Sequence, residues 1–199
     1  MAAVVVDPRK VRAFKNQKSF DDWLARHWDK ERELWLKIHK VDSGLTSITP
    51  KEAIDVALCW GWIDGIRKSF DDESFLQRFT PRGKKSVWSS VNVANVARLT
   101  HEGRMQPSGI AHVDAAKADG RWERAYSMSA SAVPEDLLAA IRSSPKAAAM
   151  YETLSAQNRF ALTFRTLSMK TDAGRKKKIA SFVAMLVRGE TVYPQRARK

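Results

Sequence analysis

The sequence has few of the residues from which disulfides, metal sites and low-complexity repeats are built. Cys59 is the single cysteine among 199 residues, so no disulfide can form within the chain, and the four histidines complete no cluster with zinc-site spacing. Nine glycines and seven prolines are too few for a collagen-like or low-complexity chain. The composition therefore predicts a globular fold that uses no metal or cofactor.

Long apolar segments and export signals are also lacking. No run approaches the roughly 18 apolar residues that cross a bilayer, and no basic segment precedes the short apolar run of MAAVVVDPRK. We expect a soluble, cytoplasmic protein without a transmembrane segment.

The common catalytic signatures are missing as well. The chain contains no GxSxG elbow, P-loop, GxGxxG fingerprint or HExxH motif. Cys59 follows Leu58 on the apolar face of a predicted helix, which favours an inert core thiol over a reactive one. The sequence therefore assigns no catalytic residue and favours a binding protein, with an enzyme of unrecognised type left open.

Positive charge, by contrast, is abundant and unevenly placed. Lysine and arginine number 35 against 22 acidic residues, a net charge of +13. Residues 170–199 hold nine of these cations and only two acidic residues, so this segment carries +7 and the other 169 residues carry +6. The location of the charge therefore matters more for choosing a partner than its total.

The N-terminal part combines helix and strand patterns. Ser19 is interpreted as the N-cap of a first helix, and residues 49–52 combine a capping threonine, a proline and a capping-box glutamate. The two-residue alternation in residues 34–39 predicts a strand, and residues 62–70 and 75–80 predict a hairpin. These patterns predict a small antiparallel sheet of about three strands.

The pattern is helical from Ser89 onward. Ser89 or Ser90 is expected to cap a helix that reaches His101, and a second helix is expected over 109–119. We predict an α+β fold, mostly helical, with an N-terminal α+β domain at 1–126 and a helical C-terminal domain with a basic tail at 133–199. The small-residue segment 127–132 is the predicted linker.

Several motifs carry a resemblance to a known family. Residues 57–65, ALCWGWIDG, resemble the ALCxGWIDG signature of the YdeI/OmpD-associated family, whose members are described as bacteriocin-protection proteins. The likeness runs from about Phe20 to Gly189 and includes RFTPR (78–82), SVWS (86–89), Asn92, EGRM (102–105), AKADGRW (116–122) and VPEDL (133–137). One departure is Gly174, which stands before Arg175 where the family reads threonine. The resemblance implies a role in resisting bacteriocins or antimicrobial peptides and no established reaction.

The polar and aromatic residues of these motifs predict one basic pocket for a small anionic ligand or an acidic partner. A guanidinium group has a planar fork that fits a carboxylate or a phosphate, and the free N–H groups of a helix start also attract anions. The predicted ligand-binding residues are Asp64, Arg67, Arg78, Arg82, Trp88, Ser89, Asn92, Arg104, Arg121 and Trp122.

Each of these residues also has a structural interpretation. Asp64 lies in a predicted strand, where it either forms a buried salt bridge or orients an arginine toward a ligand. Trp88 and Ser89 either pack and cap a helix or join an anion site. Arg104 and Arg121 follow glycines at helix ends, where the dipole favours positive charge by about 0.3–1 kcal/mol.

The alternative function is sequence-independent nucleic-acid binding through the basic C-terminal segment. In the sequence pattern, Lys176–Lys178 open the last helix, where positive charge opposes the dipole and a docked phosphate would relieve the cost. A solvated basic face is the structural interpretation. The residues predicted for this alternative are Lys176, Lys177, Lys178, Arg196, Arg198 and Lys199.

Overall fold

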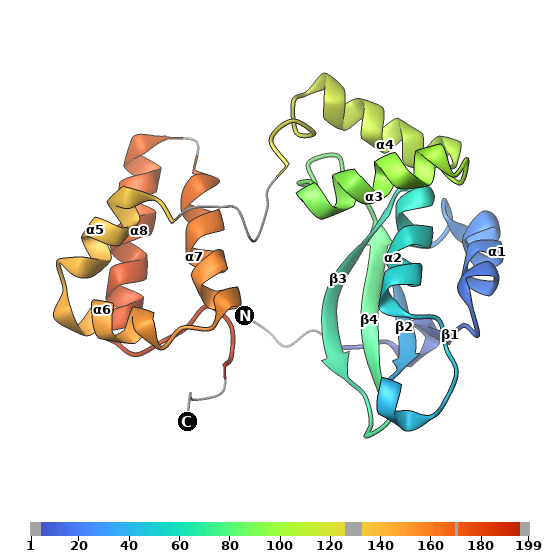
Figure 1. Ribbon diagram of the computed structural model, residues 1–199, viewed down its shortest axis with the longest axis horizontal. Helices are drawn as coiled ribbons and strands as arrows, with labels where there is room; N and C mark the ends of the chain where they lie inside the picture. Colours follow the sequence, from blue (N-terminus) through green and yellow to red (C-terminus); the bar gives the residue numbers. More distant parts are fainter. Residues whose placement is uncertain (1–4, 126–132, 170, 196–199) are drawn as a thin grey trace. The chain divides into compact units, whose positions relative to one another are not determined.

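The computed structural model describes residues 5–125, 133–169 and 171–195. The chain forms two compact units, Met1–Tyr126 and Ser127–Lys199, called here the N-terminal and C-terminal units (Figure 1). The predicted linker, 127–132, lies outside the described residues.

The N-terminal unit is built from one sheet and four α-helices. Its elements in chain order are η1 (Pro8–Lys10), β1 (Val11–Ala13), α1 (Gln17–His27), β2 (Leu34–His39), η2 (Val41–Ser43), α2 (Pro50–Cys59), β3 (Trp62–Ser69), β4 (Ser74–Pro81), α3 (Ser90–His101) and α4 (Pro107–Ala118). The α+β class and the hairpin of β3 and β4 confirm the sequence-based prediction.

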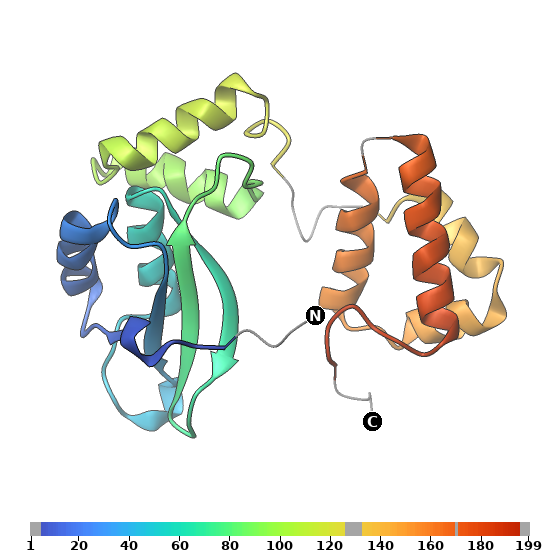
Figure 2. The ribbon, with the colours of Figure 1, turned by 180° about the vertical axis from the view of Figure 1, so that it is seen from behind.

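The sheet differs from the prediction in one strand. Its order is β1-β2-β4-β3; β2 and β3 both pair antiparallel with β4, whereas β1 pairs parallel with β2. Figure 2 shows β1 beside β2 at the edge. The sheet is therefore mixed and has four strands. The fourth was missed because its three residues, with Arg12 in the middle, are too short for a two-residue period to stand out.

Helices α1 and α2 cover one face of the sheet (Figure 1). The core between them includes Phe20 and Leu24 from α1 and Phe79 from β4, all fully buried. Helix α2 begins as predicted, because Thr49 Oγ1 accepts from Glu52 N while the Glu52 carboxylate accepts from Thr49 N. The expected start of α1 is wrong: Asn16 is its N-cap, and Ser19 is the partner in the capping box.

Helices α3 and α4 pack at the end of α2. They enclose a second core that includes Leu58, Trp88, Leu99 and Val113. Ser89 caps α3, as predicted. Helix α4 starts at Pro107, two residues before the expected start at Gly109, because proline at the first position needs no N–H partner.

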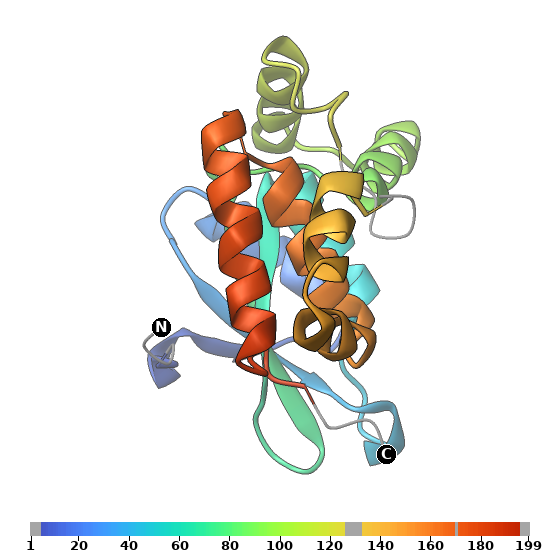
Figure 3. The ribbon, with the colours of Figure 1, turned by 90° about the vertical axis from the view of Figure 1, so that its left-hand side faces the viewer.

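The C-terminal unit is helical. Its elements are α5 (Glu135–Arg142), α6 (Pro145–Glu152), α7 (Ala156–Leu167) and α8 (Asp172–Val187). Helix α8 packs against the other three around a core that includes Leu137, Leu162 and Phe182 (Figure 3).

The start of α8 corrects the sequence interpretation. Thr171 is its N-cap, with its hydroxyl accepting from Gly174 N at 3.1 Å. Lys176–Lys178 therefore lie in the second turn, past the free N–H groups of the first turn. The argument that a phosphate would relieve their conflict with the helix dipole no longer applies to them.

Candidate functional site

The motif ALCWGWIDG forms the junction between α2 and β3. Gly61 has φ +75°, a left-handed conformation that glycine adopts without strain. The last carbonyls of a helix have no partner inside it, and here those of Cys59 and Trp60, together with the carbonyl of Gly61 just past the helix, accept from distant segments. The bonds are Gln106 N to Cys59 O at 3.0 Å, Ser108 Oγ to Trp60 O at 3.0 Å and Arg82 N to Gly61 O at 2.9 Å.

Helix α4 lies directly on this junction. A Cβ added at Gly109 would lie 2.8 Å from the carbonyl carbon of Cys59 and 2.9 Å from the oxygen of Leu58. A Cβ added at Gly61 would lie 2.6 Å from Cδ2 of His112. The two glycines thus permit a close approach that places His112 beside the junction.

The two tryptophans of the motif fasten the junction to α1. Trp60 Nε1 donates to Asp21 Oδ1 at 2.8 Å, and Trp62 Nε1 donates to the carbonyl oxygen of Trp28 at 3.1 Å. Trp62 is fully buried, whereas Trp60 is partly exposed and offers ring surface to a ligand.

A cleft of about 510 Å³ opens at this junction, and we call it the Arg82 cleft. Its volume lies within the roughly 300–1,000 Å³ that ligand pockets typically occupy. Arg32, Arg82 and Lys84 line it against one acidic residue, Asp29, so the lining has an excess of positive charge. The lining residues are Trp28, Asp29, Arg32, Trp60, Gly61, Trp62, Thr80, Pro81, Arg82, Gly83, Lys84 and His112.

Arg82 is the most buried cation of the cleft, with 3% of its surface exposed. Its guanidinium carbon lies 3.6 Å from the ring centroid of Trp88, and its Nη1 donates to Val87 O at 3.0 Å. Trp88 packs edge-on against Trp122, with ring centroids 4.9 Å apart. A planar cation is therefore held in one orientation by a stack of aromatic rings.

The pKa of His112 reflects the positive charge of this region. Burial lowers the pKa of His112 below its ordinary 6.5, and the charges of Arg82 and Arg121 lower it further. Arg121 is held by Ser86 O, to which its Nη1 donates at 2.8 Å, and by Asp119, whose carboxylate accepts from its Nε. His112 is therefore neutral at pH 7.

Asp64 does not form the salt bridge considered from the sequence. Among the described residues, no lysine or arginine nitrogen lies within 4.0 Å of its carboxylate. Burial raises the pKa of Asp64, while a backbone hydrogen bond and the charges of Arg82 and Arg67 act in the opposite direction. Arg67 instead donates to Gln77 Oε1 at 3.0 Å and lies over the ring of Phe75.

The structure separates the predicted residues into groups. Arg82, Trp88, Arg121 and Trp122 come together around the loop between β4 and α3. Two other arginines lie elsewhere: Arg78 pairs with Glu33 at 2.6 Å, and Arg104 pairs with Glu102 at 3.0 Å.

Ser89 acts as the cap of α3, accepting from Asn92 N at 3.2 Å. Arg104 lines a different pocket, together with Cys59. Burial raises the pKa of that cysteine to about 11, as expected of an inert thiol. The prediction that all ten residues line one pocket is therefore wrong.

Sequence reasoning missed several cleft residues, among them Trp28, Arg32, Lys84 and His112. Trp28 has a signal in the sequence, because its spacing continues the apolar stripe of the first helix. In the structure it is the C-cap of α1 and is 38% exposed. His112 has none, since only the docking of α4 on Gly61 brings it to the cleft.

The basic segment is only partly described. Lys176 and Lys177 are exposed on α8, and Lys178 lies half-buried with its Nζ 5.8 Å from the ring centroid of Phe182. Arg196, Arg198 and Lys199 lie outside the described residues.

The described ranges hold neither a group of metal-ligating side chains nor a membrane-spanning helix. Within 5–125, 133–169 and 171–195, no three His, Cys, Asp or Glu side chains gather where a metal ion could be held. In the same ranges, no helix has the length and apolar character needed to cross a membrane.

Comparison with known proteins divides the chain in two. Residues 12–112, just over half of the chain, match the family model described as a domain of unknown function, DUF8412. The chain belongs to the DUF8412 family. The DUF8412 match contains ALCWGWIDG, RFTPR and every residue that lines the Arg82 cleft. Arg121 and Trp122, which support that cleft, follow the end of the DUF8412 match.

Residues 130–189 match a second family model, described as bacteriocin-protection, YdeI or OmpD-associated. This match confirms the resemblance to that family for residues 130–189, in the C-terminal unit. It does not confirm the expected extent from about Phe20, because ALCWGWIDG and RFTPR lie in the DUF8412 match. No curated protein and no solved structure matches the chain.

Proposed function

We propose that the Arg82 cleft binds a small anionic ligand that carries a carboxylate or phosphate next to a flat apolar group. The observation that supports this is a buried arginine, stacked on Trp88, in a cleft whose lining has three cations and one carboxylate. Binding rather than catalysis is proposed, because the cleft holds no nucleophile and base in hydrogen-bond contact among the described residues.

The recognition follows from how each group is held. Trp88 and Val87 O fix the guanidinium of Arg82 before a ligand arrives, which reduces the entropy lost on binding. Lys84 and Arg32 are exposed at the rim and supply further positive charge. The ring surfaces of Trp28 and Trp60, which are at least partly exposed in the cleft, suit a flat apolar group.

The biological role proposed is a non-enzymatic one in stress or bacteriocin resistance, carried out in the cytoplasm. Its support is the description of the family that residues 130–189 match. An acidic side chain of a protein partner would offer the same carboxylate chemistry. The experiment below therefore distinguishes a small ligand from a protein partner.

The test uses benzoate and inorganic phosphate as probes, with the full chain followed by NMR of the indole N–H groups. We expect the signals of Trp28, Trp60 and Trp62 to shift with either probe, and Lys84→Gln to weaken binding about threefold to tenfold. Lys85→Gln is the matched control, because Lys85 is exposed next to Lys84 and does not line the cleft.

Two results would overturn the proposal. One is the absence of any indole shift with both probes, and the other is equal loss of binding in the two lysine variants. An acidic peptide that shifts the same indoles when benzoate and phosphate do not would replace the small ligand by a protein partner.

The nucleic-acid alternative is tested in parallel by titrating duplex and single-stranded oligonucleotides at rising salt. Release of counterions would make such binding fall steeply with salt. Binding that is lost when Lys176–Lys178 are neutralised, and kept in Lys84→Gln, would favour the basic segment over the cleft.

A further inference from the structure

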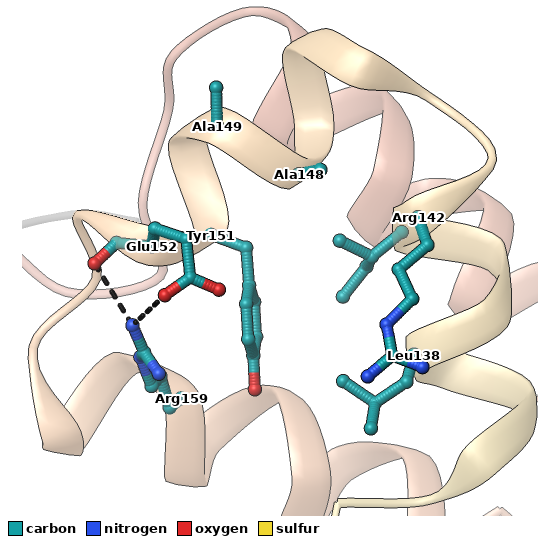
Figure 4. A pocket seen from close by; sticks show the side chains of 8 residues that line it. Leu138, Arg142, Ala148, Ala149, Tyr151, Glu152 and Arg159 are labelled. Atoms are coloured by element: carbon teal, nitrogen blue, oxygen red, sulfur yellow. Dashed lines mark hydrogen bonds and ion pairs between the residues drawn. The ribbon is translucent and has the colours of Figure 1, made fainter.

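The C-terminal unit has a pocket of its own, of about 480 Å³, between α5, α6 and α7 (Figure 4). We call it the Tyr151 pocket. Leu138 and Ile141 from α5 and Ala148 from α6 give it an apolar wall, and Arg142, Glu152 and Arg159 give it three charges. The pocket lies wholly within residues 130–189 and shares no residue with the Arg82 cleft.

Tyr151 is buried in this pocket, with 6% of its surface exposed. Figure 4 shows its ring between the pair formed by Glu152 and Arg159 and the side chains of Arg142 and Leu138. No hydrogen bond to the Tyr151 hydroxyl is formed by the residues that the structure describes. Burial raises the pKa of Tyr151, so the hydroxyl keeps its proton at neutral pH and can donate it to an acceptor.

The charges around Tyr151 leave one cation in excess. Arg159 Nη2 donates to the carbonyl and carboxylate oxygens of Glu152, at 2.9 and 3.1 Å, so these two charges offset each other. Among the described residues, Arg142 forms an ion pair with Glu135 alone, at 3.7 Å, and both side chains are mostly exposed. Such a pair is weak and screened by salt, so Arg142 can exchange it for a ligand.

We propose that the Tyr151 pocket binds a small monocarboxylate with an aromatic or branched aliphatic body. The body lies between the ring of Tyr151 and the apolar wall of Leu138 and Ile141, and the carboxylate accepts from Arg142 and from the Tyr151 hydroxyl. A single negative charge matches the single excess cation, and an apolar body matches the wall. The Tyr151 hydroxyl, to which no described residue forms a hydrogen bond, gains one from the ligand.

The probe for this proposal is phenylacetate, titrated into the full-length chain and followed by amide NMR. All seven tryptophans lie between residues 23 and 122, in the N-terminal unit. We therefore expect shifts in the amides of α5–α7, which report binding in the Tyr151 pocket separately from any indole shift caused by binding in the Arg82 cleft. Phenylethylamine, which has the same ring and the opposite charge, is expected not to bind.

The variants test the charge of Arg142 and the hydroxyl of Tyr151 separately, and they distinguish both from an effect on the fold. Arg142→Gln is expected to weaken phenylacetate binding about tenfold. Arg188→Gln, which also removes an exposed paired arginine of this unit, is expected to leave binding unchanged. Tyr151→Phe keeps the ring and is expected to weaken binding severalfold without lowering the thermal unfolding temperature.

Any of three results would overturn this proposal: no amide shift with phenylacetate, equal binding of phenylethylamine, or equal affinity in Arg142→Gln and Arg188→Gln. Phenylacetate shifts that appear only at the indoles would place its binding in the Arg82 cleft. Because the two units have different reporter signals, failure here leaves the test of the Arg82 cleft intact.

Discussion

Arg82 in the N-terminal unit and Arg159 in the C-terminal unit both lie over an aromatic ring, with guanidinium carbons 3.6 Å and 4.9 Å from the ring centroids. Arg82 Nη1 donates to the carbonyl of Val87, and Arg159 Nη2 donates to the carboxylate of Glu152. The same cation–π contact therefore belongs to two different electrostatic settings. The Arg82 cleft has an excess of two positive charges over its acidic residue, and the Tyr151 pocket has an excess of one.

This difference teaches that the partner of an arginine, more than its presence in a motif, determines what it can bind. Arg78 and Arg104 lie in motifs as specific as that of Arg82, yet each is paired with a glutamate. A paired arginine contributes to the fold, and little positive potential remains for a ligand.

The largest expected effect is a loss of stability in the N-terminal unit alone. Gly109→Ala places a methyl group against the carbonyl groups of Leu58 and Cys59, which are backbone atoms that cannot rotate away. We expect a loss of about 3 kcal/mol in the unfolding free energy of the N-terminal unit. Tryptophan fluorescence measures it, because every tryptophan lies in that unit.

The control for this variant is Gly65→Ala, where the nearest atom to an added Cβ is 3.6 Å away. It is expected to change stability much less. Equal unfolding temperatures for Gly109→Ala and the wild type would show that α4 does not press on the end of α2.

An intermediate effect concerns acid sensitivity. His112 has a folded-state pKa below 6.5, so its contribution to stability is present above pH 6.5 and is lost as the pH falls through the folded value. All four histidines lie between residues 27 and 112, so this loss is expected in the N-terminal unit. The C-terminal unit is expected to keep its stability over the same pH range.

Arg121→Met tests the cause of this shift. Removal of a nearby positive charge is expected to raise the pKa of His112, measured by NMR titration of its ring protons. Arg124→Met is the control, because Arg124 does not act on His112. An unchanged His112 pKa in Arg121→Met would leave burial and the charge of Arg82 as the causes.

The smallest expected effect lies in the C-terminal unit. Arg175 binds Asp136 through two nitrogens, at 2.6 and 2.8 Å, which joins α8 to α5 and lowers the pKa of Asp136. Asp136→Asn is expected to lower the thermal unfolding temperature slightly, since both side chains are in contact with solvent.

The contribution of this pair to stability depends on pH, because Arg175 lowers the folded-state pKa of Asp136. Its stabilisation is present above pH 3.8 and is lost as the pH falls through the folded-state pKa of Asp136, so variant and wild type converge in acid. Glu135→Gln, beside it on α5, is expected to change the unfolding temperature less. A reversed order of the two variants would contradict the assignment.

The parts of the fold that were predictable are those with local signals. The capping box of Thr49 and Glu52, the cap at Ser89 and the alternation in residues 34–39 each specify an element from a few neighbouring residues. Helix α8 shows the limit of such signals. The lysine run suggested a start at Lys176, and the weaker pair of Thr171 and Asp172 was the true one.

The candidate site was less predictable because its residues meet only through tertiary structure. The sequence grouped Arg82 with Trp88, and these two side chains, six residues apart, do stack on each other. It gave no distance between motifs, so Arg78 and Arg104 were grouped with Arg82 although each has its own carboxylate partner.

The hydrogen bonds at the end of α2 have a consequence for how the protein is made. The carbonyl of Trp60 accepts from Ser108, which lies 48 residues later in the chain, and Cys59 O accepts from Gln106. A growing chain that has released only α2 and the hairpin therefore lacks these partners, and water must hydrate the carbonyls until α4 emerges. The DUF8412 match ends at His112, inside α4, so a fragment cut at that boundary would remove part of the helix that completes the junction. A fragment that keeps both the complete junction and the ring contact of Trp88 therefore has to extend through the end of α4 to Trp122.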